Sequence, residues 1–220
     1  MKKTVKTIET LITWSGEGID VGKRLLIIRF KTCNRRCVWC DTQVRMRSSI
    51  ETEITFEEIQ KTINIEKCGI MLTGGCPTFG KNLQSSIDII NEIDCNLYNV
   101  ETNGYALPEL ISKVRKDKNV KYIYSPKLFS EEDYKFYIDL TNKIKDEEKV
   151  YIKLVCEDRP MVIEFLDYLQ KIEFPNDRLW LMPEGVTSEE ILAHAPFVFD
   201  MAEKYKANFS SREHIIYGFV

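Results

Sequence analysis

Three cysteines, Cys33, Cys37 and Cys40, lie within eight residues and follow directly after an apolar segment. Thiolates at this CxxxCxxC spacing can hold three corners of one iron–sulfur cluster. A cluster held by three protein ligands leaves one iron open to a small molecule. Because catalytic metal sites keep a position open whereas structural sites are closed, the spacing predicts a site for chemistry.

A structural zinc ion is the main alternative use of these cysteines. Such an ion needs four ligands, normally Cys or His. No second cysteine pair at short spacing follows the motif, and the only two histidines are His194 and His214. Disulfides are less expected still, because seven cysteines are an odd number and three of them are clustered.

The composition is that of a soluble globular protein. The chain has 220 residues with 44% hydrophobic content, which predicts one domain spanning residues 1–220. Its formal net charge of −3 and the absence of a basic stripe argue against nucleic acid as a partner. No apolar run approaches the ~20 residues of a membrane helix, so no membrane partner is expected. The N-terminus lacks the apolar core of a signal peptide, and together with the cysteine pattern this predicts a cytoplasmic protein.

Short apolar runs alternate with helical patterns along the chain. Continuous apolar runs are typical of parallel strands that are buried on both faces. Capping boxes at residues 55–58 and 187–190, and Pro108 in a first helical turn, predict helices between the runs. Six βα units predict an α/β fold, a partial (βα)6-type parallel barrel. The expected strands are residues 25–30, 70–73, 97–101, 120–124, 150–155 and 179–182.

Polar and glycine-rich clusters follow five of these strands. Each cluster alone is an ordinary turn signal. Barrels of this kind place their sites at the carboxyl ends of the strands, so the repetition predicts one rim that carries the site. The clusters are the Cys33 loop and residues 73–77, 101–104, 125–127 and 182–185.

These motifs resemble those of radical S-adenosylmethionine enzymes. More narrowly, they resemble the 7-carboxy-7-deazaguanine synthase family of queuosine and deazapurine biosynthesis, and the resemblance spans nearly the whole chain. Arg29 lies four residues before the first cluster cysteine, as in the family. The other matching segments are Ser15-Gly16-Glu17-Gly18, Trp39-Cys40-Asp41-Thr42, Glu101-Thr102-Asn103-Gly104 and Ser125-Pro126-Lys127.

The resemblance implies a partial-barrel radical enzyme with three cofactors: a [4Fe–4S] cluster, S-adenosylmethionine and Mg²⁺. Cys33, Cys37 and Cys40 would hold the cluster, and S-adenosylmethionine would bind its open iron. Thr42 would help to bind Mg²⁺, a hard cation suited to oxygen ligands. The implied cofactor-binding residues are Trp39, Cys40, Asp41, Gly74, Gly75, Glu101, Asn103, Ser125, Pro126 and Lys127.

The family substrate is 6-carboxy-5,6,7,8-tetrahydropterin, which loses a hydrogen from C6 and contracts with loss of ammonia to 7-carboxy-7-deazaguanine. Glu17 and Arg29 are the implied catalytic residues. Arg29 would pair the substrate carboxylate in a two-pronged geometry, and Glu17 would accept hydrogen bonds from the pterin N–H groups. The implied substrate-binding residues are Trp14, Ser15, Gly16, Glu17, Arg29, Thr73 and Val220, and residues 212–215 resemble a basic and histidine-containing patch of the family.

Two residues depart from the family pattern. Cys76 stands where the family has a glutamate that accepts a hydrogen bond from the amino group of S-adenosylmethionine, and a thiol is a much weaker acceptor. Glu101 could substitute for it. Ser15 stands where the family has glutamine, and its side chain reaches less far. Cys76 as a fourth cluster ligand is disfavoured, because it would close the open position.

Two other functions share part of this pattern. Glycyl-radical-enzyme activases carry the same CxxxCxxC motif but act on a protein backbone. A cluster-binding regulatory protein that has lost catalysis would explain Cys76. For the enzyme, the electron must come from an external donor such as flavodoxin or ferredoxin, and the resemblance implies a homodimer.

Overall fold

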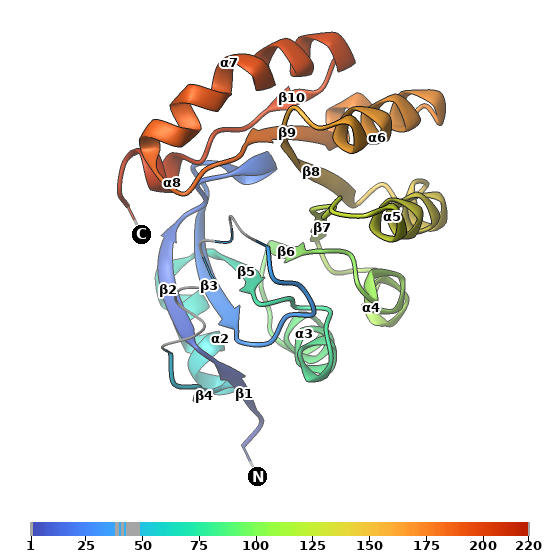
Figure 1. The fold of residues 1–220 in the computed structure, drawn as a ribbon. Helices are drawn as coiled ribbons and strands as arrows, with labels where there is room; N and C mark the ends of the chain where they lie inside the picture. The colour runs from blue at the N-terminus through green and yellow to red at the C-terminus, as the bar shows by residue number, and fades with distance from the viewer. Residues whose placement is uncertain (1, 38–39, 41, 43–48, 220) are drawn as a thin grey trace. The chain divides into compact units, whose positions relative to one another are not determined.

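The computed structural model describes residues 2–37, 40, 42 and 49–219. The chain folds into two compact units. Unit 1 comprises Met1–Trp14 and Lys23–Tyr122, and unit 2 comprises Ser15–Gly22 and Ile123–Val220. Figure 1 gives the element labels used below. The single domain over residues 1–220 stays a prediction.

Unit 1 is built on a sheet with the strand order β2-β3-β5-β6. Strands β3 (Arg24–Phe30), β5 (Gly69–Gly74) and β6 (Tyr98–Thr102) are parallel, and β2 (Glu9–Trp14) pairs with β3 in the antiparallel direction. The register of β3 and β5 sets Arg29 beside Thr73 and Phe30 beside Gly74. The carboxyl ends of these two strands therefore lie together, as parallel pairing requires.

Three helices of unit 1 pack against this sheet, namely α2 (Phe56–Glu66), α3 (Lys81–Glu92) and α4 (Leu107–Lys113). The predicted capping box begins α2: Thr55 Oγ1 accepts from Glu58 N at 3.1 Å, and Glu58 Oε2 accepts from Thr55 N at 2.8 Å. Pro108 lies in the first turn of α4, as predicted. Fully buried aliphatic residues on both the strands and the helices form the core of the unit.

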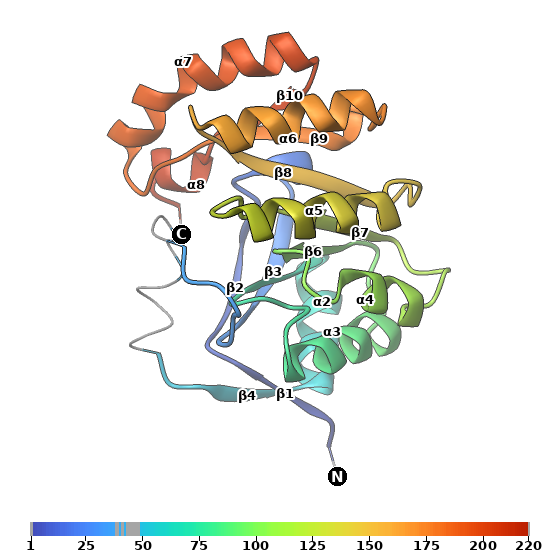
Figure 2. The same ribbon diagram turned by 45° about the vertical axis from the view of Figure 1, so that its right-hand side comes forward.

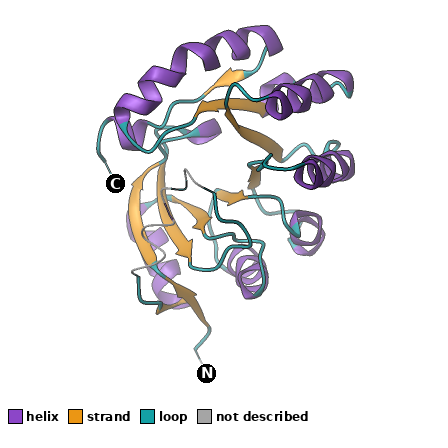
Figure 3. Ribbon diagram, in the orientation of Figure 1, coloured by secondary structure: helices purple, strands orange, loops and turns teal. Residues whose placement is uncertain are grey.

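A separate antiparallel pair, β1 (Thr4–Thr7) and β4 (Thr52–Thr55), accompanies unit 1 (Figure 3). The sequence did not indicate these strands or β2. Both β1 and β4 are four residues long and rich in threonine, so they carry no apolar run, and their pairing partner lies far away in sequence.

Unit 2 has the strand order β8-β9-β10, and these strands are parallel where they pair. They are β8 (Val150–Cys156), β9 (Leu179–Pro183) and the short β10 (Asn208–Phe209). Strand β7 (Val120–Tyr124) contains the boundary between the two units. Short 3₁₀ turns lie at η1 (Gly18–Asp20) and η2 (Asn176–Arg178).

The helices of unit 2 are α5 (Glu131–Ile144), α6 (Pro160–Lys171), α7 (Ser188–Tyr205) and the short α8 (Glu213–Ile216). Figure 2 shows α5, α6 and α7 one above another in chain order. Helix α6 buries Val162, Phe165, Leu166 and Leu169, an i, i+3, i+4, i+7 pattern that faces the strands. The second predicted capping box, at Thr187 and Glu190, begins α7.

All six predicted strands are present to within a residue or two of their expected ends, which confirms an α/β fold with a mostly parallel sheet. Among the described strands, β2 and β10 stand at the two ends of the strand order. In the described part of the chain, no helix combines the length and the apolar character needed to cross a bilayer.

Candidate functional site

The loop that carries the cysteines leaves the end of β3 and is fixed by the loop after β5. Gly75 N donates to Phe30 O and Cys76 N donates to Thr32 O, each at 2.8 Å. A Cβ atom on Gly75 would lie 2.1 Å from Thr32 O, so only glycine fits this crossing. The Gly-Gly sequence after β5 therefore has a structural reason, which is the close approach of the cysteine loop.

The three motif cysteines are free thiols, with Cys37 buried and Cys33 and Cys40 partly buried. Burial raises the pKa of the Cys33 thiol to about 11, and the neighbouring thiols of Cys76, Cys37 and Cys40 shift this pKa in the same direction. Three free cysteines in one loop are the donor set that a [4Fe–4S] cluster requires.

A structural zinc ion needs four ligands, normally Cys or His. The CxxxCxxC motif supplies three cysteines, the number that leaves one iron of a cluster open. Among the described residues, no group of three or more His, Cys, Asp and Glu side chains could hold one ion.

Cys76 lies in a buried polar network with a fully buried side chain. Its Sγ is 3.3 Å from Thr78 Oγ1, 3.2 Å from Thr102 Oγ1 and 3.3 Å from Asn103 Oδ1. Thr78 and Thr102 also hydrogen-bond to each other at 2.6 Å. The thiol is therefore engaged by protein groups. The sequence analysis missed Thr78 and Thr102, although both lie in the strand-end clusters or directly after them.

Arg29 joins the end of β3 to β2 and to Thr42. Its Nε donates to Glu9 Oε2 at 2.8 Å, and its Nη1 donates to Thr42 Oγ1 at 3.1 Å. Arg29 and Thr42 are both buried. A Cβ on Gly74 would lie 2.3 Å from Arg29 Cγ, and Gly74 has a φ of +95°, so glycine is required here. Glu9 was missed because β2 was not predicted.

The other predicted residues of unit 1 occupy strand ends. Trp14 is the last residue of β2 and is 55% exposed. Thr73 and Glu101 are half-buried on β5 and β6, and Asn103 is buried just beyond β6. The predicted residues Trp39, Asp41 and Val220 lie outside the described residues.

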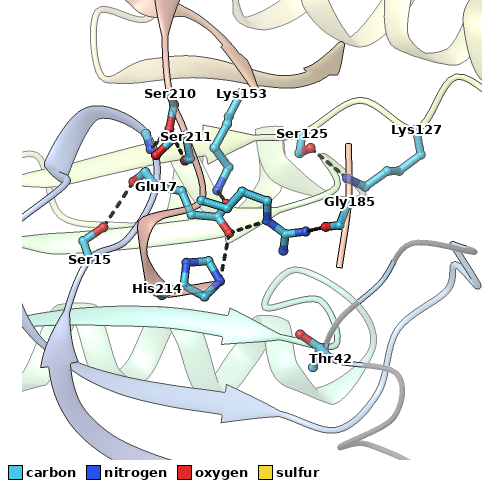
Figure 4. A network of polar contacts seen from close by, with 12 residues as sticks. Ser15, Glu17, Thr42, Ser125, Lys127, Lys153, Gly185, Ser210, Ser211 and His214 are labelled. Atoms are coloured by element: carbon cyan, nitrogen blue, oxygen red, sulfur yellow. Dashed lines mark hydrogen bonds and ion pairs between the residues drawn. The ribbon is translucent and has the colours of Figure 1, made fainter. Parts of the chain in front are cut away.

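Glu17 in unit 2 is surrounded by cationic side chains. Its Oε2 accepts from Lys153 Nζ at 2.7 Å, and its Oε1 lies 3.4 Å from Arg212 Nε and 3.5 Å from His214 Nε2 (Figure 4). Burial favours a higher pKa for the Glu17 carboxyl, but the charges of Lys153, Arg212 and His214 hold that pKa well below its ordinary value. Glu17 is therefore ionised at neutral pH.

The loop at residues 15–22 is tied to the C-terminal segment. Gly18 N donates to Ser210 Oγ at 2.6 Å, and Glu213 N donates to Gly16 O at 2.9 Å. A Cβ on Gly16 would lie 2.5 Å from His214 Nδ1, so a side chain there would displace the imidazole. The Ser15 hydroxyl donates to Glu17 O at 3.2 Å (Figure 4). Ser15 thus stabilises the loop around Glu17.

The remaining predicted residues of unit 2 follow β7. Lys127 Nζ donates to Ser125 Oγ at 2.7 Å, with Ser125 and Pro126 buried and Lys127 partly buried (Figure 4). The structure therefore brings Ser125 and Lys127 together, and their binding of the cofactor stays a prediction.

Lys153 is a functional candidate that the sequence analysis did not single out. It is the only charged residue in β8, whose sequence is VYIKLVC. A lone lysine in an apolar strand must find a buried partner, which is the signal that could have identified it. Arg212 is the first residue of the patch that resembles the family, and its Nη1 also donates to Gly185 O.

The known proteins to which this chain is similar include enzymes of the family that its motifs resemble. No family model matches it. A 7-carboxy-7-deazaguanine synthase from Hyperthermus butylicus is 24% identical over 225 residues, which cover 98% of this chain and 94% of the relative. The chain thus resembles a synthase of this name over nearly its whole length, as the motifs predicted.

Two solved structures share the fold. QueE from Escherichia coli has a TM-score of 0.64 at 19% identity, and the match covers 96% of this chain and 95% of that chain. Streptococcus suis SuiB bound to S-adenosylmethionine has a TM-score of 0.59 at 15% identity, covering 85% of this chain and 49% of that chain. At these identities the matches establish the α/β fold.

Proposed function

We propose that this chain is a 7-carboxy-7-deazaguanine synthase, a lyase that converts 6-carboxy-5,6,7,8-tetrahydropterin to 7-carboxy-7-deazaguanine with loss of ammonia. The observation that carries the proposal is the ionised Glu17 carboxylate held by Lys153 and Arg212 within the Ser-Gly-Glu-Gly motif. The CxxxCxxC loop and the similarity to named synthases over nearly the whole chain support the same reaction.

Cys33, Cys37 and Cys40 hold the [4Fe–4S] cluster in this proposal. When bound, the cluster would supply an electron and S-adenosylmethionine would supply the carbon radical that abstracts hydrogen from the substrate. The remaining proposed cofactor contacts are Trp39, Asp41, Gly74, Gly75, Glu101, Asn103, Ser125, Pro126 and Lys127. Glu101 provides the carboxylate for the cofactor's amino group, because the Cys76 thiol is engaged elsewhere.

Glu17 orients the pterin by accepting hydrogen bonds from its N–H groups. A carboxylate is an acceptor only when ionised, and Lys153 and Arg212 keep Glu17 in that form. Two permanent cations face one carboxylate here, so this part of unit 2 has an excess of positive charge that suits an anionic substrate. Ser15, Gly16 and Val220 are the further proposed substrate contacts of this unit.

Arg29 and Thr42 bind the substrate carboxylate and Mg²⁺. The guanidinium suits two-pronged pairing with a carboxylate. The Thr42 hydroxyl accepts from Arg29, and a hydroxyl oxygen is a suitable ligand for the hard cation Mg²⁺. Because a guanidinium and Mg²⁺ repel each other, an anion shared between them lowers the energy of both. Thr73 and Trp14 complete the proposed contacts.

The electron is supplied by an external donor such as a flavodoxin or ferredoxin, since the reaction needs a reductant that the chain does not carry. A homodimer is proposed from the family resemblance.

An anaerobic assay tests the function. The chain is reconstituted with iron and sulfide and given S-adenosylmethionine, Mg²⁺, a reductant and 6-carboxy-5,6,7,8-tetrahydropterin, and products are followed by mass spectrometry. Formation of 7-carboxy-7-deazaguanine supports the proposal. If 5′-deoxyadenosine forms without it, the substrate assignment is wrong and a glycyl-radical-enzyme activase becomes the better hypothesis. Cys40→Ser is expected to abolish both products, whereas Cys95→Ser, outside the motif, serves as the matched control.

A further inference from the structure

The side-chain amide of Asn103 is held at both of its ends. Its Oδ1 accepts from Cys76 Sγ at 3.3 Å and from Tyr105 N at 3.1 Å. Its Nδ2 donates to Asn34 Oδ1 at 2.7 Å and to Cys33 Sγ at 3.8 Å. Because two donors face one end of the amide, that end must be the oxygen, and the NH₂ group is directed at the cysteine loop.

Cys76 is well placed to enforce this orientation. A thiol has one proton, and Asn103 Oδ1 can only accept, so the S–H bond points at Asn103. Thr78 and Thr102 hydrogen-bond to each other, so only one of their two hydroxyls has a proton left to donate to the sulfur. An ionised glutamate, which the related family carries at this position, has no proton to donate. The cysteine therefore gives this chain a contact that the glutamate cannot make.

The backbone of Cys76 is bonded to the same loop. Cys76 N donates to Thr32 O at 2.8 Å, and Asn82 Nδ2 donates to both Thr32 O and Cys76 O, at 3.1 and 2.9 Å. Residue 76 is thus rigidly placed relative to Thr32 and Cys33, and its thiol fixes a second group, Asn103, against the same loop. Both contacts lie within unit 1.

An N–H group that donates to a cluster thiolate changes the energy of the cluster. Reduction adds negative charge that is shared with the sulfur ligands, and a hydrogen-bond donor stabilises that charge. Hydrogen bonds to the sulfurs therefore raise the reduction potential of an iron–sulfur cluster.

We propose that Asn103 is a positioning residue whose Nδ2–H donates to the Cys33 thiolate, and that Cys76 acts through Asn103 by fixing its amide, so that the pair raises the reduction potential of the cluster. The inference rests on the proposed function only for the identity of the cluster ligands. It does not depend on the pterin substrate.

The test is a spectroelectrochemical titration of the reconstituted cluster, without substrate, in the wild type and in Asn103→Ala, Cys76→Ala and Cys76→Ser. Asn103→Ala is expected to make reduction about threefold less favourable, a downward shift of ~30 mV for a one-electron couple. Cys76→Ala shifts the potential in the same direction by less. Cys76→Ser keeps a proton for Asn103 Oδ1 and restores the potential towards the wild-type value.

Two further variants distinguish an effect of Cys76 through Asn103 from a general disturbance of the structure. The double variant Cys76→Ala/Asn103→Ala is expected to match Asn103→Ala alone, because Cys76 acts only through Asn103. Asn99→Ala is the matched control: Asn99 is a fully buried asparagine on the preceding strand whose amide has no hydrogen-bond partner in the described structure, and its removal should leave the potential unchanged.

An unchanged potential in Asn103→Ala overturns the proposal. Additive shifts in the double variant overturn the role of Cys76. If Asn103→Ala does not fold, the test is a comparison of the reduction potentials of Cys76→Ala and Cys76→Ser. Equal potentials in these two variants reject the proposal. If the variants show these shifts but the wild type never converts the carboxypterin, the proposed function is refuted and this inference still holds.

Discussion

Lys153 Nζ donates a 2.7 Å hydrogen bond to Glu17 Oε2 across 136 positions of the sequence. The lysine side chain is 8% exposed and the glutamate side chain 19% exposed, so the pair is largely shielded from water. The ammonium group of Lys153 and the carboxylate of Glu17 stabilise each other in this shielded position. Their ion pair therefore fixes the loop that carries the Ser-Gly-Glu-Gly motif to β8.

Glu17→Gln should destabilise the protein substantially. The substitution leaves Lys153 and Arg212 buried without their carboxylate, and breaking a buried pair in this way costs about 3–5 kcal/mol. Urea unfolding followed by circular dichroism measures the loss. The control is Glu109→Gln, which removes an exposed i,i+4 pair with Lys113 and should cost only about 0.3–0.5 kcal/mol. Equal losses in both variants would contradict the shielded pair.

Acid should reduce the contribution of Glu17 to stability. Its pKa in the folded state is lower than the ordinary value of 4.5 that applies in the unfolded chain. As the pH falls below about 4.5, the unfolded chain binds the proton first, so protons favour unfolding. The contribution is therefore complete above about pH 4.5 and is lost as the pH falls towards the folded-state pKa.

The measurement is the unfolding free energy of the wild type and Glu17→Gln at pH 7, 5, 4 and 3. The gap between the two proteins should be constant down to about pH 5 and should narrow below it. A gap that widens in acid would mean that the folded-state pKa is raised instead.

Gly75→Ala should loosen the cysteine loop. The added Cβ would lie 2.1 Å from Thr32 O, so the loop must move, and overpacking of this kind costs about 1–3 kcal/mol. The iron content after reconstitution should fall together with the stability of the cysteine loop. Gly22→Ala, whose Cβ meets nothing within 4 Å, strains only its own backbone and should keep full iron content. Normal iron content in Gly75→Ala would show that the loop tolerates the shift.

Arg29→Lys should weaken substrate binding if Arg29 pairs the pterin carboxylate. Lysine keeps the charge but loses the two-pronged geometry, and a charge-assisted hydrogen bond is worth about 1.5–3 kcal/mol, so KM should rise about tenfold to a hundredfold. Cleavage of S-adenosylmethionine in the absence of pterin should continue. Arg24→Lys is the control, since Arg24 lies on the same strand but pairs with Glu66 at the surface. A rise in KM for both variants would point to general damage to β3.

Elements whose signals come from neighbouring residues could be predicted before the fold was known. Six apolar runs became strands, and the capping boxes at Thr55 and Thr187 began helices, because both signals are local. The CxxxCxxC spacing likewise fixed the candidate cluster ligands, since three cysteines in one loop need no distant partner. The short strands β1, β4 and β10 escaped prediction because they are held by pairing with distant segments rather than by their own composition.

Which polar groups contact one another depends on the folded chain and could not be predicted from local patterns. Lys153 and Arg212 converge on Glu17 from positions far along the chain, and Cys76 finds Asn103 across 27 positions. The sequence identified Cys76 as a departure from the family but did not single out Lys153. The contacts of Cys76 and Lys153 depend on the strand register and on how the loops cross. A buried charge or thiol interacts with whichever protein groups replace water around it, and these groups come from distant parts of the chain.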